Sequence, residues 1–430
     1  MLRFREDGRF YCETVSAARW SAVVSGNADR VCVRTPRVWP SEASAVLFAQ
    51  RESDIIGGCH RKSYWRLTGE PQTNTIDVIG ARRFRTGRAM ELDIITLAKD
   101  AGVFVACGVR YHVADIDLPL ELDLVVCDPD DNKLYIVENK TIYGYVSNKK
   151  VIKEGRPKLE GVMQSVIYLN EFGNGVKLKR IIRESWDRKQ ELARMMLVLE
   201  EAGDTGGAVY WNLKKEYDRN RIEVDFANLD LGQDGLVAVK MTYETRDDCA
   251  TREFDIGLSQ DPLDGLHYPE IDGMPQKLFT VESIYERYKI LQDHYLRNVE
   301  MVREQMAKEG LLPPGVDGTV RNEIDLEVAD RSFWDEVFRR VRALHSRFWP
   351  PAEYEWKYAP EKIQVLGEAG IIGKTKYKDW QKRVKGKTHV GAWQCAYCPH
   401  KAKCISVEYP EYTHLIADML SVDAEEEAAA

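Results

Sequence analysis

The alternation of apolar and polar residues separates a first part of the chain, with both strand and helix patterns, from a second, mainly helical part. Apolar residues recur at helical spacing in five segments, which predicts helices over residues 42–67, 84–101, 157–172, 281–308 and 325–348. Runs of β-branched and apolar residues predict strands over residues 103–111, 120–127, 133–141, 208–213 and 221–226. We expect short strands and turns over residues 1–45 and irregular structure over 245–275.

The order of these elements indicates an α/β fold with a mixed central sheet flanked by helices. Residues 128–132, Asp-Pro-Asp-Asp-Asn, are turn formers between two strand patterns and predict a β-hairpin. We expect the second helix to end at Gly102 and the helix over 281–308 to end at Gly310. The sequence contains no internal repeat and no long low-complexity linker.

Charged residues interrupt the two apolar strands of the predicted hairpin. Side chains alternate along a strand, so Glu138 and Lys140 share one face while Asn139 points away, and the hairpin can bring Asp123 to the same face. Buried carboxylates are costly unless they bind a cation or a partner. Carboxylate oxygens suit Mg²⁺ or Mn²⁺. The alternative is an ordinary Glu–Lys pair on a solvated strand, but the apolar flanking residues favour the metal site.

At these residues the chain resembles the PD-(D/E)XK nucleases, and within them the RecB-like exonuclease branch. Asp123 matches the first-strand aspartate, and Glu138 with Lys140 matches the Glu-x-Lys of the next strand. Two departures are present, since Asn139 is polar where the family often has an apolar residue and Leu122 replaces the proline of the family name. The resemblance implies a restriction-endonuclease-like core with a mixed sheet.

Two helix motifs extend this resemblance. Residues 87–91, Gly-Arg-Ala-Met-Glu, resemble the upstream helix motif in which a Glu or His gives a further metal contact. Residues 164–168, Gln-Ser-Val-Ile-Tyr, are similar to the Q-x-x-x-Y motif of the following helix, whose Gln and Tyr lie on one face. Taken alone, Glu91 would be an ordinary carboxylate of an amphipathic helix, and Gln164 and Tyr168 a half-buried pair.

The resemblance implies a hydrolase that cleaves DNA phosphodiester bonds with the help of Mg²⁺ or Mn²⁺. Because this branch is mostly exonucleolytic, we expect an exonuclease, with a place in DNA repair or recombination. The resemblance implies that the metal is bound by the catalytic residues Glu91, Asp123 and Glu138, together with the backbone carbonyl of Asn139. It implies that Lys140, also catalytic, positions the attacking water, and that Gln164 and Tyr168 contact the substrate.

Four of the nine cysteines follow a pattern typical of a metal centre. Cys395, Cys398 and Cys404 have the spacing C-x-x-C-x5-C, in which a C-x-x-C loop offers two thiolates to one metal. Cys59 is the candidate fourth ligand, with a buried structural cysteine as the alternative. Local spacing alone favours Zn²⁺, and His400 offers a second zinc set together with the three C-terminal cysteines.

The position of these cysteines on either side of the nuclease motifs resembles the iron–sulfur subset of RecB-like nucleases. That subset includes CRISPR-adaptation nucleases, AddB-type recombination subunits and nuclease–helicases of DNA replication, in which a [4Fe–4S] cluster joins the ends of the nuclease domain. The resemblance therefore favours [4Fe–4S] over zinc and a helical C-terminal region closed by this clasp. Together with the pattern of elements, these motifs divide the chain into an N-terminal strand and turn segment (1–48), a nuclease core (49–240), an irregular then helical region of unknown role (241–390), a cysteine segment that packs back on Cys59 (391–410) and an acidic tail (411–430).

The net charge of −8 permits a nucleic-acid partner without indicating one, because only the surface that faces the phosphates must be basic. Basic clusters at 82–88, 177–183 and 382–387 could form such a surface or could be solvated faces. The sequence has no G-x-x-x-x-G-K-[ST] motif, so we expect single-stranded DNA or DNA ends as substrate and a helicase or recombination partner for any unwinding.

The sequence also predicts a cytoplasmic protein with no membrane partner, because no apolar run reaches membrane-spanning length and no secretory signal is recognisable. Two other functions remain open. One is a non-catalytic DNA-binding or scaffold subunit that keeps the nuclease fold, although the intact Asp123, Glu138 and Lys140 argue against it. The other is a zinc-stabilised interaction protein in which the Glu-x-Lys pattern is accidental.

Overall fold

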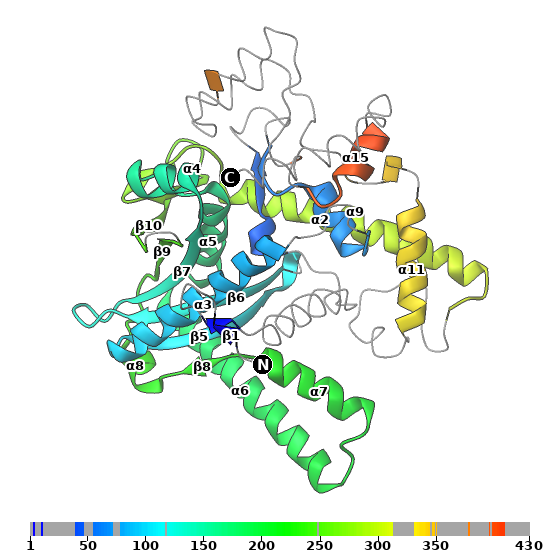
Figure 1. Cartoon of the computed structure of the whole chain (residues 1–430), viewed down its shortest axis with the longest axis horizontal. Helices are drawn as coiled ribbons and strands as arrows, with labels where there is room; N and C mark the ends of the chain where they lie inside the picture. Colours follow the sequence, from blue (N-terminus) through cyan, green and yellow to red (C-terminus); the bar gives the residue numbers. More distant parts are fainter. Residues whose placement is uncertain are drawn as a thin grey trace.

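An eight-stranded mixed sheet forms the centre of the molecule, in the strand order β12-β11-β10-β9-β7-β6-β5-β8 (Figure 1). The computed structural model describes residues 3–4, 10–11, 39–46, 55–71, 78–116, 118–246, 249–312, 331–344, 346–348, 350, 377–378, 395 and 398–408. Neighbouring strands are antiparallel except β7 and β9, which run parallel. The strands are β5 (Phe104–Val113), β6 (Leu118–Cys127), β7 (Leu134–Ile142), β8 (Glu223–Val224), β9 (Ala238–Thr245), β10 (Thr251–Gln260), β11 (His267–Ile271) and β12 (Met274–Pro275).

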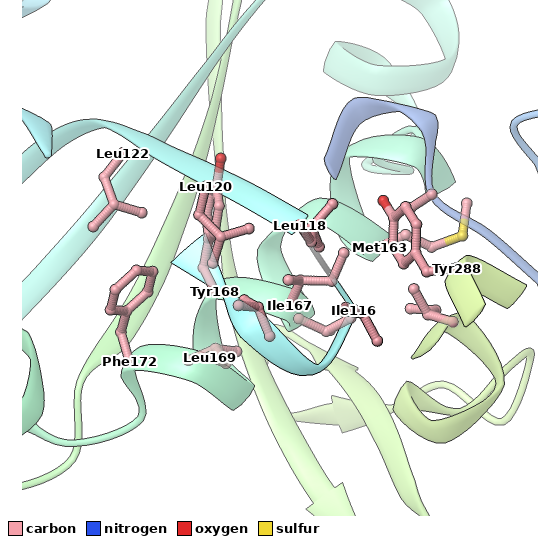
Figure 2. Close-up of a cluster of buried hydrophobic side chains, with 14 of the residues drawn as sticks. Ile116, Leu118, Leu120, Leu122, Met163, Ile167, Tyr168, Leu169, Phe172 and Tyr288 are labelled. Atoms are coloured by element: carbon pink, nitrogen blue, oxygen red, sulfur yellow. The ribbon is translucent and has the colours of Figure 1, made fainter. Parts of the chain in front are cut away.

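Helices cover both faces of this sheet, which confirms the predicted α/β class. On one face the C-terminal half of α3 (Val78–Asp100) buries Ile95 and Ala98 against β5 and β6. On the other face lies α5 (Leu159–Phe172), which is buried on nearly all sides because α9 (Val281–Lys308) covers it from behind. A helix enclosed in this way is apolar around most of its circumference, as the sequence of α5 is. In Figure 2, Ile167, Tyr168 and Phe172 of α5 lie against Leu118, Leu120 and Leu122 of β6.

Two further helices, α6 (Gly175–Glu201) and α7 (Ala208–Arg219), form a hairpin that projects from the sheet (Figure 1). The side chain of Asn174 caps α6 by accepting a hydrogen bond from the Lys177 backbone N–H at 2.8 Å. Arg188 of α6 pairs with Glu216 of α7 at 2.9 Å. The remaining elements are β1 (Arg3–Phe4), β2 (Phe10–Tyr11), η1 (Pro40–Glu42), β3 (Ser44–Val46), β4 (Ile55–Gly57), α2 (His60–Leu67), η2 (Ala114–Ile116), α4 (Tyr145–Asn148), the π-helical turn η3 (Lys149–Lys153), α8 (Phe226–Leu231), α11 (Arg331–Ala343), η4 (Ser346–Phe348) and α15 (Lys401–Glu408).

Most of the predicted elements are confirmed within a few residues. These are the helices at 84–101, 157–172 and 281–308, the three strands between 103 and 141, and most of the helix at 325–348. The hairpin turn at 128–132 is also present, with Asn132 in the left-handed region at φ 56°. None of the helices in the described ranges is both long and apolar enough to cross a membrane.

Three predictions of secondary structure are wrong. The described residues of the range 42–67 contain two short strands, β3 and β4, and one full helix, α2. Gly57 has φ 93° and Gly58 lies tightly against the Glu42 carbonyl oxygen, so the chain turns sharply before Cys59. Residues 208–213 belong to a helix, because packing of α7 along α6 overrides the strand preference of its aromatic and β-branched residues.

The third error concerns residues 245–275, which form β10, β11 and β12 rather than irregular structure. Of β10 only Phe254 and Ile256 are fully buried, while its first residues and Asp255 are exposed. A strand with so few buried positions gives a weak apolar pattern, and its hydrogen-bond partners lie in β9 and β11. Most of residues 1–45, predicted as strands and turns, lies outside the described residues, which include β1 and β2.

Candidate active site

The predicted acidic centre lies where the pairing of β6 and β7 ends. The last paired residues are Leu124 and Val137, so Asp123 and Glu138 come next along their two strands. Lys140 follows on β7 and forms an ion pair with the Glu138 carboxylate. Side-chain alternation places Glu138 and Lys140 on the same face of the sheet, toward α5. The strand pair thus brings two carboxylates and one ammonium group to one point.

The Glu138 carboxylate is the most deeply buried charge of this group. Its side chain is 1% exposed, and neither oxygen accepts a hydrogen bond from any residue in the described part of the chain. The ion pair with Lys140 is the contact that offsets its charge. A buried carboxylate that has one ammonium group as its partner is costly unless a further cation completes its environment, so Glu138 fits a metal ligand.

Glu91 of α3 lies close to the same centre and adds a third carboxylate. Burial, and next the negative charge of Glu138, raise the pKa of Asp123 well above its usual value. Burial also raises the pKa of Glu91, against the opposing charge of Arg88, and the charges of Glu121 and Glu138 add to the increase. Three carboxylates from α3, β6 and β7 therefore repel one another at short range, a situation that a divalent cation relieves.

Lys140 remains a cation in these surroundings. Burial lowers its pKa, but the charges of Glu138 and Asp123 outweigh burial, so the net effect raises the pKa above the usual value. A lysine in this state cannot serve as a general base at neutral pH. It can donate hydrogen bonds and stabilise negative charge.

A chain of hydrogen bonds fixes Lys140 from the side of α5. The Lys140 ammonium donates to Gln164 Oε1 at 3.0 Å, and Gln164 Nε2 donates to Tyr168 Oη at 2.7 Å. Tyr168 Oη in turn donates to the Glu121 backbone carbonyl at 3.0 Å. Gln164 and Tyr168 are 9% and 1% exposed, so their observed contacts lie inside the protein. Both residues of the helix motif thus belong to the hydrogen-bond chain that holds Lys140 in place.

Asn139 lies on the opposite side of β7 from Glu138 and Lys140. Its neighbour on that side, Val137, packs against the cluster formed with α3. Both amide atoms of the Asn139 side chain are buried without a hydrogen-bond partner among the described residues. The side chain therefore does not reach the acidic centre, so any contribution of Asn139 there must come from its backbone.

No three His, Cys, Asp or Glu side chains in the described ranges stand in the arrangement of an ion-binding group. In the acidic centre Lys140 lies among the carboxylates and pairs with Glu138. The donor set of carboxylate oxygens is nevertheless the set that Mg²⁺ and Mn²⁺ prefer. Binding such an ion would require the three carboxylates to move closer together.

Three of the four predicted cysteines, Cys59, Cys398 and Cys404, lie near one another although they are far apart in the sequence, but in the described residues they do not stand in the arrangement of an ion-binding group. Burial raises the pKa of the Cys59 thiol to about 11, and the nearby thiols of Cys398 and Cys404 contribute to the increase. The Cys398 backbone N–H donates to the Cys395 carbonyl at 3.2 Å, which closes the C-x-x-C turn. Cys59 itself is the N-cap residue of α2.

Other contacts hold the two cysteine segments against each other. The Lys403 ammonium of α15 pairs with Glu70 at 2.5 Å. The ring of His400 is buried edge-on against Trp65 of α2, with 5.5 Å between ring centroids. The segment that carries Cys398 and Cys404 is therefore packed on α2, directly after Cys59.

The basic cluster at 177–183 is fully occupied by ion pairs. Lys177 pairs with Glu171, Lys179 with Asp234, Arg180 with Glu184 and Arg183 with Asp230. Its charges are therefore neutralised within the fold. The side chains of residues 82–85 and the whole cluster at 382–387 lie outside what the structure describes.

Sequence reasoning missed one contact near the site. Gly87 packs so closely that an added Cβ would lie 2.9 Å from the Arg246 guanidinium and 3.0 Å from Thr141 Oγ1. Arg246 Nε donates to this Thr141 hydroxyl at 3.1 Å. Arg246 follows β9 directly, and no local pattern connects it with residues 87–91.

Comparison with known proteins gives no match to any family model, curated protein or solved structure.

Proposed function

We propose that this chain is a metal-dependent nuclease of the PD-(D/E)XK type that hydrolyses phosphodiester bonds of DNA. The observation that carries the proposal is the convergence of Glu91, Asp123 and Glu138 on Lys140 at the end of a strand pair. Buried carboxylates that repel one another weaken a fold. A divalent cation bound between them would attract all three carboxylates and, on its open side, a phosphate group.

The three carboxylates would hold the metal, together with the backbone carbonyl of Asn139. Mg²⁺ or Mn²⁺ would polarise a phosphoryl oxygen and lower the pKa of a bound water. Lys140 would position the attacking water and stabilise the negative charge that develops on the phosphate. Gln164 and Tyr168 would orient Lys140 through the hydrogen bonds described above and lie beside the substrate. By resemblance, the cleavage is exonucleolytic and starts from DNA ends or single strands.

The four cysteines would hold a [4Fe–4S] cluster that joins the segment around Cys59 to the segment 395–404. The proximity of three of the thiols and the packing of α15 on α2 support a shared metal centre, and four thiolates also suit Zn²⁺. Anaerobic purification distinguishes the two metals. A brown protein that absorbs near ~400 nm, as thiolate-bound iron does, indicates the cluster, whereas a colourless protein with one equivalent of zinc rejects it.

Nuclease activity is tested with end-labelled single- and double-stranded DNA in the presence of Mg²⁺, Mn²⁺ or EDTA. We expect cleavage with either metal, none with EDTA, and loss of cleavage in Lys140→Ala and Glu138→Gln. The matched control is Glu304→Gln, which removes an exposed carboxylate of α9 far from the site and should cleave as the wild type does.

A folded wild type that binds DNA but cuts no substrate under any metal condition would contradict the nuclease proposal. It would favour instead a DNA-binding subunit that keeps the nuclease fold. Cleavage that persists in both site variants would show that the activity comes from another part of the chain or from a contaminant.

A further inference from the structure

The connection between β7 and α5 carries a high density of positive charge. Residues 149–158, Lys-Lys-Val-Ile-Lys-Glu-Gly-Arg-Pro-Lys, contain five basic residues and one acidic residue. They form η3 and the turn that leads into α5, next to α4 at one end of the sheet (Figure 1). This segment therefore begins shortly after Lys140 and ends six residues before Gln164.

None of these five basic side chains forms an ion pair with any residue that the structure describes. The basic residues at 177–183, by contrast, are each paired with a carboxylate. Of the five, Lys150 is half-buried and the others, among them Lys158, are exposed. Partial burial lowers the pKa of Lys158, and the charges of Lys150 and Arg246 lower it further against the opposing charge of Glu160. Five cations close together, with only the charges of Glu154 and Glu160 against them among the described neighbours, favour binding of an external anion.

The backbone fixes this charge next to the active site. The Lys158 backbone N–H donates to Tyr243 Oη at 2.9 Å, and Tyr243 lies beside Lys140 in the register of β7 and β9. Arg246, which follows β9, is held over β7 by its bond to Thr141. On the outer side, the Arg252 guanidinium lies 3.2 Å from the place that a Cβ on Gly155 would take. Two further cations, Arg246 after β9 and Arg252 of β10, thus border the segment.

We propose that residues 149–158 bind the phosphate backbone of the DNA strand next to the scissile phosphate, with Lys150 and Lys158 as the main contacts and Arg246 beside them. The inference rests on the proposed nuclease function for the identity of the ligand. A surface of this kind binds without regard to base sequence, because the phosphates carry the contacts.

The distance between Lys158 and Gln164 indicates where Lys158 would contact the DNA strand relative to the scissile phosphate. Lys158 and Gln164 are six residues apart, which is about 9 Å along a helix at ~1.5 Å per residue. Along the axis of a DNA duplex, where one strand advances about 3.4 Å per nucleotide, this distance corresponds to two or three phosphates. Lys158 should therefore contact a phosphate about two or three nucleotides from the one that is cleaved.

The test measures binding of a labelled 20-nucleotide single strand by fluorescence anisotropy, with Ca²⁺ in place of Mg²⁺, over a series of salt concentrations. The variant is Lys150→Ala/Lys158→Ala, and the control is Lys214→Ala/Lys308→Ala, which removes the same charge from α7 and α9. We expect weaker binding by the first variant and a slope of log K against log salt that is less steep by about 1.4, at ~0.7 per lost phosphate contact. The control should keep the wild-type slope.

Cleavage kinetics provide the second measurement. With a long substrate the first variant should raise KM and leave kcat nearly unchanged, whereas a trinucleotide too short to reach Lys158 should be cleaved equally by both proteins. Equal affinity and equal salt slope in the variant and the wild type would overturn the proposal even if the protein is a nuclease. Loss of binding in the variant of a protein that never cuts DNA would leave the binding surface standing and reject the nuclease activity.

Discussion

Removal of the Tyr168 hydroxyl breaks the hydrogen-bond chain that supports Lys140 at its far end. The substitution Tyr168→Phe keeps the buried aromatic ring and removes only Oη. Gln164 Nε2 then loses its acceptor at 2.7 Å, and the Glu121 carbonyl loses its donor at 3.0 Å. Water cannot easily replace the hydroxyl, because the Tyr168 side chain is 1% exposed.

The magnitude of the effect follows from the two groups left without a partner. Each buried polar group without a hydrogen bond costs about 1–3 kcal/mol, so for two such groups we expect the free energy of unfolding to fall by about 2–6 kcal/mol. An unfolding entropy of about 2.1 cal/mol/K per residue gives roughly 0.9 kcal/mol/K for 430 residues. The Tm should therefore fall by about 2–7 °C, which differential scanning calorimetry resolves.

The same substitution should reduce catalysis through Lys140. Gln164 would be free to rotate once Tyr168 no longer holds its amide, and Lys140 would lose its orientation. Removal of a group that orients a metal ligand or catalytic side chain typically reduces activity by about 10- to 100-fold. Since the DNA contacts are unchanged, the loss should appear in kcat and not in KM.

Tyr288→Phe is the matched control for this prediction. Tyr288 of α9 is also buried, and its hydroxyl donates to the backbone carbonyls of Trp39 at 3.0 Å and Pro40 at 3.2 Å, away from the acidic centre. It should lower the Tm by a similar amount and leave kcat unchanged. If both variants lose stability equally and both keep the wild-type kcat, Tyr168 does not position Lys140, and the reasoning is refuted.

Four other substitutions test separate parts of the structure. Burial and the Glu138 charge raise the pKa of Asp123 in the folded protein, so ionisation of this carboxyl destabilises the fold as the pH rises above ~4. Asp123→Asn should therefore raise the Tm at pH 7.5 in EDTA, and this gain should disappear toward pH 4. The Tm of the variant should not respond to Mg²⁺. Asn139→Val removes two unpaired buried atoms and should raise the free energy of unfolding in urea by about 1–3 kcal/mol. Gly108→Ala, at φ 62° and against backbone at 2.9 Å, should lower it by about 1–3 kcal/mol or more. With the proposed cluster bound, Cys59→Ser should abolish its visible absorbance and lower the Tm, and a variant that keeps both would exclude Cys59 as a ligand.

The sequence could predict those elements whose pattern is strong and whose partners are local. The hairpin of β6 and β7 is an example, because both strands alternate clearly and the turn between them is rich in turn formers. The opposite example is β10, where few buried residues mark the strand and the pairing with β9 and β11 supplies the order. The helix α7 was missed because its aromatic residues favour strands locally, whereas packing on α6 decides its structure.

The same distinction applies to the site. The positions of Asp123, Glu138 and Lys140 relative to one another follow from strand alternation and one hairpin, and the structure places them together. The contact between Arg246 and Thr141 could not be predicted, because it depends on the parallel pairing of β7 with β9 across a long connection. That the cations at 149–158 form no ion pair with the described residues could not be predicted either, because a sequence does not show which lysines have carboxylate neighbours.

The location of the site within the chain separates its chemistry from the cysteine clasp. All candidate catalytic and positioning residues lie between Glu91 and Tyr168, on α3, the β6–β7 hairpin and α5, which pack on one another directly. The cysteines instead join α2 to α15 and touch none of the hydrogen bonds that hold Lys140. Loss of the metal at the cysteines should therefore reduce activity through local unfolding of α2 and α15. The remaining folded molecules should keep the wild-type kcat, so that activity and the folded fraction decline together.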